Sequence, residues 1–229
     1  ASDAEVHGRL TAITDDLLDE VFAIAPHLGA TVVVNRLSKL VMDPLASRVP
    51  VDSTPCEGRL DADTLLRLLA GPLRNTQYAS EPRGRLRDYL DSLLSVIQES
   101  VDRDGFCVLV EARTWTSEPP HEQTMAEDDV RVRVATHPAL TPAWLLAPWQ
   151  DEAFAPHLEW RELAPAEIAP LVASLQERFG DRLCFLQLEV DQHSYLDLHD
   201  GRCFHRWSPG PDFVRFLMAQ IADRLDERC

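Results

Sequence analysis

Apolar residues recur three or four positions apart in several segments, and this spacing predicts amphipathic helices over 14–26, 84–105 and 211–227. Shorter helices are predicted at 60–71 and at 167–180, the second beginning near Pro170, because proline is tolerated in the first turn of a helix. The 84–105 segment is the clearest, since its large apolar residues share one face: Leu86, Tyr89, Leu90, Leu93, Leu94, Ile97 and Val101.

Four segments have strand-like patterns, at 29–35, 106–112, 129–136 and 183–190. The 129–136 segment alternates valine with arginine, so we expect one face of this strand to be wet and place it at the edge of a sheet. The 183–190 run is almost continuously apolar, which is typical of a strand covered on both faces. The stretch from 141 to 160 is rich in proline and tryptophan and reads as irregular.

Strands and helices alternate along the chain with short linkers, and no repeat is evident. This order favours one three-layer α/β domain spanning residues 1–229, with a mostly parallel or mixed central sheet. Two domains divided near Pro119, inside a long polar loop, are the alternative.

Charge and composition narrow the class of partner. The net charge of −16 repels phosphate backbones, so we expect no nucleic-acid partner, and a cationic partner or a peptide is electrostatically easier. No segment has the length and apolarity of a membrane span, and the first residues lack a signal-peptide pattern, so a cytoplasmic location is expected. The five cysteines are scattered without a Cys-x-x-Cys pair, which argues against a zinc knuckle or redox pair.

Candidate chemistry is found where apolar strands turn polar. Glu111 and Glu189 each follow such a run, and two acids at one sheet edge could act as a base and a metal ligand. The alternative is that each pairs with an arginine, such as Arg113 or Arg36. His193, His199 and His205 recur every six residues, but their segment reads as a strand end and a turn, so a histidine metal cluster is not favoured.

Three stretches, in order, resemble the N-formylglutamate amidohydrolase family. The segment 14–22 is similar to its Thr-Asp helix, and 25–44 is similar to the part that leads through an apolar strand to Ser-Arg-x-Val-Val-Asp-Pro. The segment 186–197, LQLEVDQHSYLD, resembles a late Leu-Gln-Leu-Glu-Ile-Asn-Arg motif. The resemblance implies a fold similar to zinc carboxypeptidases and an activity in which bound zinc directs water against an amide.

This sequence departs from the family at the positions that carry the chemistry. The family opens with a strand ending in Pro-His-x-Gly, whereas here His7 is the only early histidine, so we expect a domain that lacks the first strand. Arg113 stands where the resemblance expects a ligand histidine, and a guanidinium cannot coordinate zinc. Asp191 and Gln192 replace an asparagine and an arginine, and Leu45 and Ala46 replace a polar pair. We therefore expect neither metal nor cofactor.

The favoured hypothesis is a non-catalytic peptide-binding protein on this scaffold. Fold-level analogy suggests that it presents a peptide to a modifying enzyme in a bacterial peptide natural-product pathway. An edge strand at 129–136 could also accept an extended peptide. The residues expected to line the ligand site are Arg36, Asp43, Glu111, Arg113, Glu189 and Asp191.

Two other functions stay open. One is an active zinc amidohydrolase acting on N-acyl amino acids or peptides, with ligands drawn from His7, Asp15, Glu111, His137 or Glu189. The other is a partner subunit whose interface contains Trp144, Trp149 and Trp160. Arg113 itself also has a plain interpretation, as a surface residue paired with Glu111 or Glu118.

Overall fold

The computed structural model describes residues 18–34, 80–115, 131–150, 154, 156–164, 169–195 and 209–228. The predicted helix at 60–71 lies outside these residues, as do the predicted site residues Arg36 and Asp43.

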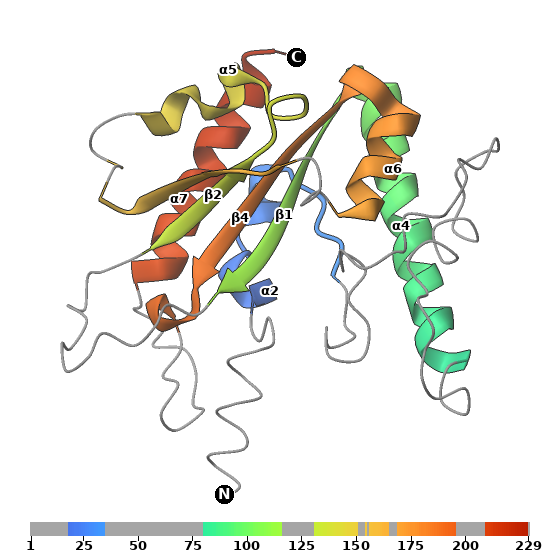
Figure 1. The fold of residues 1–229 in the computed structure, drawn as a ribbon, viewed down its shortest axis with the longest axis horizontal. Helices are drawn as coiled ribbons and strands as arrows, with labels where there is room; N and C mark the ends of the chain where they lie inside the picture. The colour runs from blue at the N-terminus through green and yellow to red at the C-terminus, as the bar shows by residue number, and fades with distance from the viewer. Residues whose placement is uncertain are drawn as a thin grey trace, which may run out of the picture. The chain divides into compact units, whose positions relative to one another are not determined.

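A four-stranded mixed sheet holds the candidate residues. Its order is β1 (Cys107–Trp115), β4 (Leu183–Asp191), β2 (Val132–Thr136) and β3 (Leu158–Glu162). β2 runs antiparallel to β4 and parallel to β3. Figure 1 shows β1 and β4 side by side and pointing the same way, so their carboxyl ends lie at one edge of the sheet.

Three long helices lie where the apolar spacing predicts them. They are α4 (Ser80–Asp104), α6 (Pro170–Phe179), which begins at a proline, and α7 (Pro209–Asp226). The predicted helix at 14–26 contains only a short α2 (Leu18–Val21) within its described part, followed by a 3₁₀ turn, η1 (Ala25–Leu28). The remaining described helical turns are α5 (Ala143–Leu146), η3 (Ala147–Gln150), η5 (Gly180–Arg182) and η6 (Gln192–Ser194).

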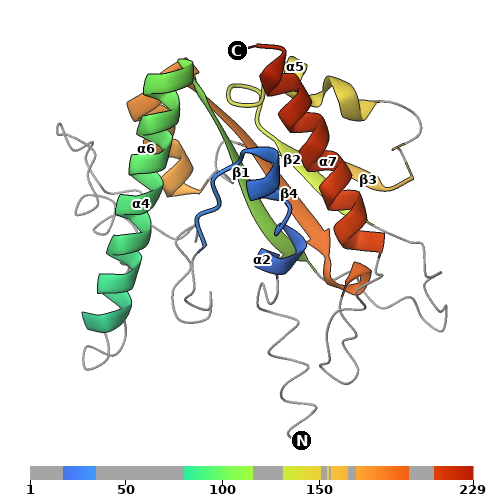
Figure 2. The same cartoon turned by 180° about the vertical axis from the view of Figure 1, so that it is seen from behind.

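The chain divides into two compact units, each assembled from separate segments. The first comprises 1–32, 110–162 and 185–229, and the second 33–109 and 163–184. In the first unit, the register pairs Val132 with Val190 and Val134 with Leu188, and all four side chains are buried. Figure 2 shows α7 and α2 on the near face of the sheet, and the buried residues of α7 are Val214, Leu217, Met218 and Ile221.

The opposite face of this sheet is polar. Alternate residues of a strand point to opposite faces, so Arg133 shares its face with its register partners Glu189 and Glu159. The guanidinium of Arg133 lies over the Trp115 ring, which places the odd-numbered residues of β1, Glu111 and Arg113 among them, on this face as well. Toward the carboxyl ends of β1 and β4 the sheet therefore has a hydrocarbon side and a charged side, whereas Cys107 and Leu183, at the other ends of these strands, belong to an apolar cluster.

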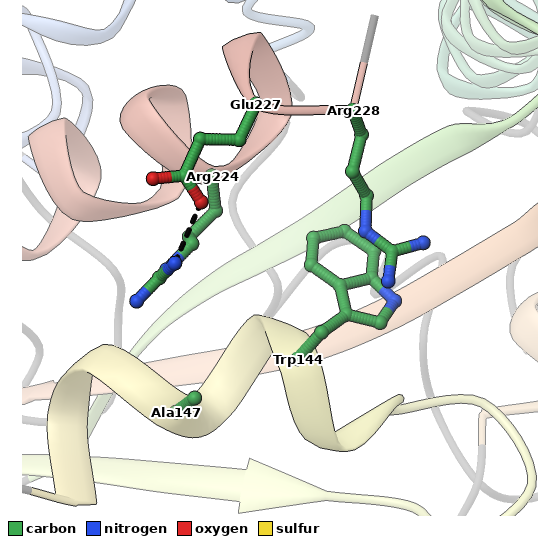
Figure 3. Close-up of a pocket in the computed structure, with 5 residues that line it drawn as sticks. All are labelled: Trp144, Ala147, Arg224, Glu227 and Arg228. Atoms are coloured by element: carbon green, nitrogen blue, oxygen red, sulfur yellow. Dashed lines mark hydrogen bonds and ion pairs between the residues drawn. The ribbon is translucent and has the colours of Figure 1, made fainter.

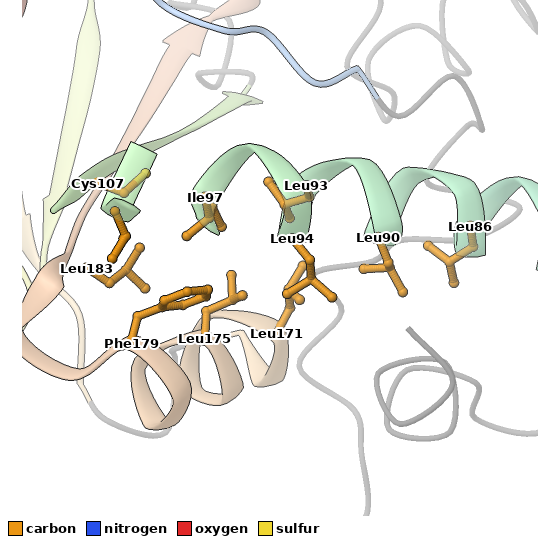
Figure 4. Close-up of a cluster of buried hydrophobic side chains, with 11 residues drawn as sticks. Leu86, Leu90, Leu93, Leu94, Ile97, Cys107, Leu171, Leu175, Phe179 and Leu183 are labelled. Carbon is orange, nitrogen blue, oxygen red and sulfur yellow. The ribbon is translucent and has the colours of Figure 1, made fainter. Parts of the chain in front are cut away.

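The second unit is held by an apolar cluster between α4 and α6. Leu86, Leu90 and Ile97 of α4 are buried together with Leu175 and Phe179 of α6. Figure 4 shows these side chains pointing toward one another from the two helices, with Cys107 and Leu183 closing one end. The single apolar face predicted for the 84–105 helix is confirmed, and α6 is its partner.

Three strand predictions differ from the structure. Residues 30–34 form no strand, and Val32 and Val34 are 41% and 39% exposed, because β-branched residues need a neighbouring strand that the described residues do not provide here. The 129–136 strand is β2, which has neighbours on both sides, so its placement at the sheet edge is wrong. The edge strands of the described sheet are β1 and β3, and β3 begins in the stretch that reads as irregular.

Candidate functional site

Glu111 and Arg113 form an ion pair on the polar face of β1. The Nε of Arg113 donates to Oε1 of Glu111. Residues two apart on a strand share a face, which brings both side chains together without any loop. Glu111 is buried, at 8% exposure, whereas the Arg113 side chain keeps 32% of its surface. The predicted pairing of Glu111 with Arg113 is confirmed, and Glu111 lies within β1 and not at its end.

Glu189 is the second strand carboxylate, and it is also neutralised. The amide of Gln187 donates to its Oε1 at 2.7 Å, and a terminal nitrogen of Arg133 donates to its Oε2 at 3.1 Å. The sequence suggested an arginine partner such as Arg36, which lies outside the described residues. Arg133 takes that role because the β2–β4 register places it directly opposite Glu189.

Arg133 is the residue that sequence reasoning missed. Its second terminal nitrogen donates to Glu159 of β3 at 3.1 Å, and its guanidinium carbon lies 4.1 Å from the Trp115 ring centre. Burial by itself lowers the pKa of Arg133, but the hydrogen bonds with Glu159 and Glu189 outweigh it and raise the pKa overall. The alternation in 129–136 indicates only that Arg133 and Arg131 share a face, and the contact with Glu189 follows from the β2–β4 register.

The carboxyl ends of β1 and β4 are tied together beyond the two carboxylates. Asp191 is fully buried, and its Oδ1 accepts from the backbone N–H of His193 at 3.2 Å, so it caps η6. The amide of Gln192, also fully buried, donates to Thr114 Oγ1 of β1 at 3.2 Å. Asp191 therefore supports the shape of this edge from below its surface.

His137 lies apart from this network. His137 is buried in a turn after β2, where its backbone N–H donates to Thr141 Oγ1 at 2.8 Å and its Nδ1 accepts from the N–H of Ala139 at 3.3 Å. Thr141 in turn donates to the carbonyl of Phe185 at 2.7 Å. His137 thus helps to fasten a turn onto β4. His7, His199 and His205 lie outside the described residues.

The described donor set at this edge does not fit a zinc ion. Zinc sites in proteins use neutral imidazole, thiolate and carboxylate ligands, three of them even in an open catalytic site. Within the residues that the structure describes, no three His, Cys, Asp or Glu side chains come together in this way. Glu111 and Glu189 each face an arginine, and a fixed guanidinium charge opposes a second cation nearby.

A separate hollow of about 410 Å³ lies in the first unit between α5, η3 and the last turn of α7. Figure 3 shows Arg228 stacked over Trp144, at 4.0 Å from the ring centre, beside the ion pair of Arg224 and Glu227 at 2.6 Å. The other tryptophans of the predicted interface are split, because Trp149 is buried and Trp160 is 42% exposed. The three tryptophans therefore differ in exposure and do not all lie on one exposed surface.

Comparison with solved structures shows the same fold in an amidohydrolase. The crystal structure of N-formylglutamate amidohydrolase from Ralstonia eutropha JMP134 matches with a TM-score of 0.61 and 13% sequence identity, over 96% of this chain and 86% of that chain. No family model and no curated protein matches the chain. The predicted mixed α/β fold and its likeness to the amidohydrolase scaffold are confirmed. No described helix has the length and apolarity needed to cross a membrane.

Proposed function

We propose that this chain is a non-catalytic peptide-binding protein built on an amidohydrolase-like scaffold, with its ligand held at the carboxyl ends of β1 and β4. One observation carries the proposal. Both buried carboxylates on the polar face of β1 and β4, Glu111 and Glu189, form ion pairs with arginines, Arg113 and Arg133. A site with this charge pattern suits a ligand that is anchored by hydrogen bonds and ion pairs.

The ligand class follows from the scaffold and from Arg113. By its name, the structural neighbour acts on N-formylglutamate, an acylated amino acid with an amide and carboxylates. A peptide has the same groups. A guanidinium has five N–H donors in a planar fork, so Arg113 can hold Glu111 and a ligand carboxylate at the same time. Arg36 and Asp43, which lie outside the described residues, complete the proposed lining together with Glu189, and Asp191 supports the site from beneath.

The proposed role is to present the bound peptide to a peptide-modifying enzyme. The support for this role is analogy, since a scaffold that grips an acyl amino acid and performs no hydrolysis is suited to holding a substrate for another protein. A modifying enzyme that recognises the complex and ignores the free peptide is the expected partner.

Metal content and binding are the first test. Protein purified without chelator is assayed for zinc by mass spectrometry and for formate release from N-formyl-L-glutamate. Binding is measured by calorimetry with paired peptides that carry a free or an amidated carboxyl terminus. We expect zinc well below one equivalent, no formate, and binding of the free-carboxylate peptides alone. Stoichiometric zinc with formate release would establish the alternative, a zinc amidohydrolase on N-acyl amino acids or peptides.

The matched variant is Glu111→Gln combined with Arg113→Gln, which removes both charges and leaves no buried carboxylate unpaired. We expect at least a tenfold loss of affinity, equivalent to about 1.4 kcal/mol. The control is Arg87→Glu on the exposed face of α4. No binding by wild-type protein to any carboxylate-bearing peptide contradicts the proposal.

A further inference from the structure

β3 presents an exposed edge of the sheet. Among the described strands it pairs only with β2, and four of its five residues are exposed. Figure 2 shows β3 at the outer side of β2. Edge strands offer a row of backbone N–H and C=O groups to another strand, and proteins usually blunt them with proline, lysine or a bulge. The sequence of β3, Leu158–Glu162, contains no proline and no lysine, although the strand is short and three of its five residues are charged.

The register shows which backbone groups of β3 point outward. The N–H of Val132 donates to the carbonyl of His157 at 2.9 Å, so His157 turns its backbone groups toward β2. Backbone direction alternates along a strand, and Glu159 and Arg161 therefore also face β2. Trp160 and Glu162 direct their N–H and C=O groups away from the sheet, and so does the carbonyl of Leu158, whose N–H already donates to the carbonyl of Phe154 at 3.1 Å. An added antiparallel strand would form its hydrogen bonds with these three residues.

We propose that a second copy of this chain pairs with β3 in antiparallel fashion, with Trp160 of the two copies opposite each other on the two-fold axis. This register makes Trp160 a hydrogen-bonded pair with itself, in agreement with its outward backbone direction. It also places Glu159 opposite the second copy's Arg161, and Arg161 opposite the second copy's Glu159. The strand is thus complementary in charge to itself, which a symmetric interface requires.

The surroundings of β3 extend this complementarity. Arg133 donates to Glu159 at 3.1 Å, so the second copy's Arg161 would continue an alternation of positive, negative and positive charge across the axis. On the other face of β3, Trp160 is 42% exposed, and large exposed aromatic residues are typical of interfaces. Phe216 of α7, 39% exposed, stacks on Phe154 with ring centres 5.1 Å apart, near the start of β3.

A second copy explains the features of β3 better than an unrelated peptide does. A cationic peptide would suit the net charge of −16. Its positive side chains would however lie opposite Arg161, which has the same charge. Two copies repel at long range because both are acidic, and salt screens this term within about 8 Å at physiological ionic strength. The inference concerns oligomeric state and is independent of the proposed peptide site, so either can fail alone.

Charge reversal and mixing test the register. Sedimentation velocity and light scattering are run at physiological salt on wild-type protein, Glu159→Arg and Arg161→Glu. We expect a wild-type dimer, and a loss of dimer by tenfold or more for each single variant, because each puts like charges opposite. A mixture of the two variants restores all charge pairs and should form a heterodimer. The controls are Asp88→Arg and Arg87→Glu, equal charge changes on the exposed face of α4.

Hydrogen exchange gives an independent readout on unaltered protein. Amides of Trp160 and Glu162 should become more protected as protein concentration rises, whereas the amide of Leu158, already bonded to the carbonyl of Phe154, and the β4 amides should not change. A wild-type monomer, a dimer that survives both single variants, or a mixture that stays monomeric overturns the proposal. A monomer that protects these amides only when a foreign extended peptide is added overturns it as well and assigns the edge to that peptide.

Discussion

Arg133 reaches across a whole strand to lie over Trp115. The arginine is on β2 and the tryptophan on β1, with β4 between them in the sheet order. On the way its guanidinium donates to Glu189 of β4, and its other arm donates to Glu159 of β3. A single side chain therefore contacts residues from all the other described strands. These contacts pair the charges on the polar face of the sheet and fix the side chains that carry them.

Replacing Arg133 with methionine should destabilise the protein by about 3 kcal/mol, because Glu189 stays buried without its cation. The methionine retains much of the apolar contact with Trp115, so the loss reports mainly on charge. Urea unfolding with equal m-values measures the difference. Glu159→Gln is the matched control and should cost less than about 1 kcal/mol, since Glu159 is 56% exposed.

The double variant Arg133→Met with Glu189→Met separates pairing from packing. If the loss in the single variant comes from an uncompensated carboxylate, removing that carboxylate too should recover part of the lost stability. The opposite outcome is a double variant that is even less stable than Arg133→Met, by as much as a second core mutation costs. It would show that Glu189 stabilises the fold even without its arginine.

Arg113→Ala should lower stability as well as ligand affinity, because Glu111 is 8% exposed and loses its partner. A drop of about 2 kcal/mol is expected, and it should disappear largely when Glu111→Gln is added. Thermal unfolding of the single and double variants checks this. A fully stable Arg113→Ala protein would mean that the ion pair is as weak as an exposed one, which is the plain interpretation of Arg113.

Much of the fold could be predicted from periodicity, and its failures have physical causes. The α4, α6 and α7 helices and the β4 strand follow from local apolar spacing. β3 does not, because a strand with one buried residue out of five carries no alternation signal. The 29–35 segment shows the opposite error, a strand predicted where residues 30–34 form none. β propensity reflects packing against neighbouring strands, and Val32 and Val34 have no such neighbour among the described residues.

One of the two ion pairs of the candidate site could be predicted from the sequence. The pairing of Glu111 with Arg113 is local, because two residues separate them on one strand. The pairing of Glu189 with Arg133 spans 56 positions and depends on the β2–β4 register, which no local pattern reveals. Placing 129–136 at the edge hid this contact, because an edge strand would have turned Arg133 toward solvent instead of toward a buried carboxylate.

Leu175→Ala should cost about 3 kcal/mol, since Leu175 is fully buried in the cluster between α4 and α6 and its loss leaves a cavity there. Ligand affinity should not change, because none of the described residues of the proposed site belongs to this cluster. Calorimetry and denaturant titration on one preparation measure both. A cost below about 1 kcal/mol would mean that the cluster of Figure 4 refills the space left by the leucine.

Cys107 should make the protein less stable at alkaline pH. Burial raises the pKa of its thiol above the ordinary value, an effect that a hydrogen bond with Ser100 opposes only in part. The unfolded chain loses this proton at a lower pH than the folded chain does. Stability is therefore complete below the unfolded pKa, about 8.5, and falls by up to about 1.4 kcal/mol per pH unit as the pH rises toward the folded pKa. Cys107→Ala should be less stable at neutral pH but show a flatter decline in stability above neutral pH.

Peptide mapping after iodoacetamide provides the second check, because a protonated buried thiol reacts only as fast as the protein opens. Rapid alkylation of Cys107 in folded protein at pH 8 would contradict both its burial and its raised pKa.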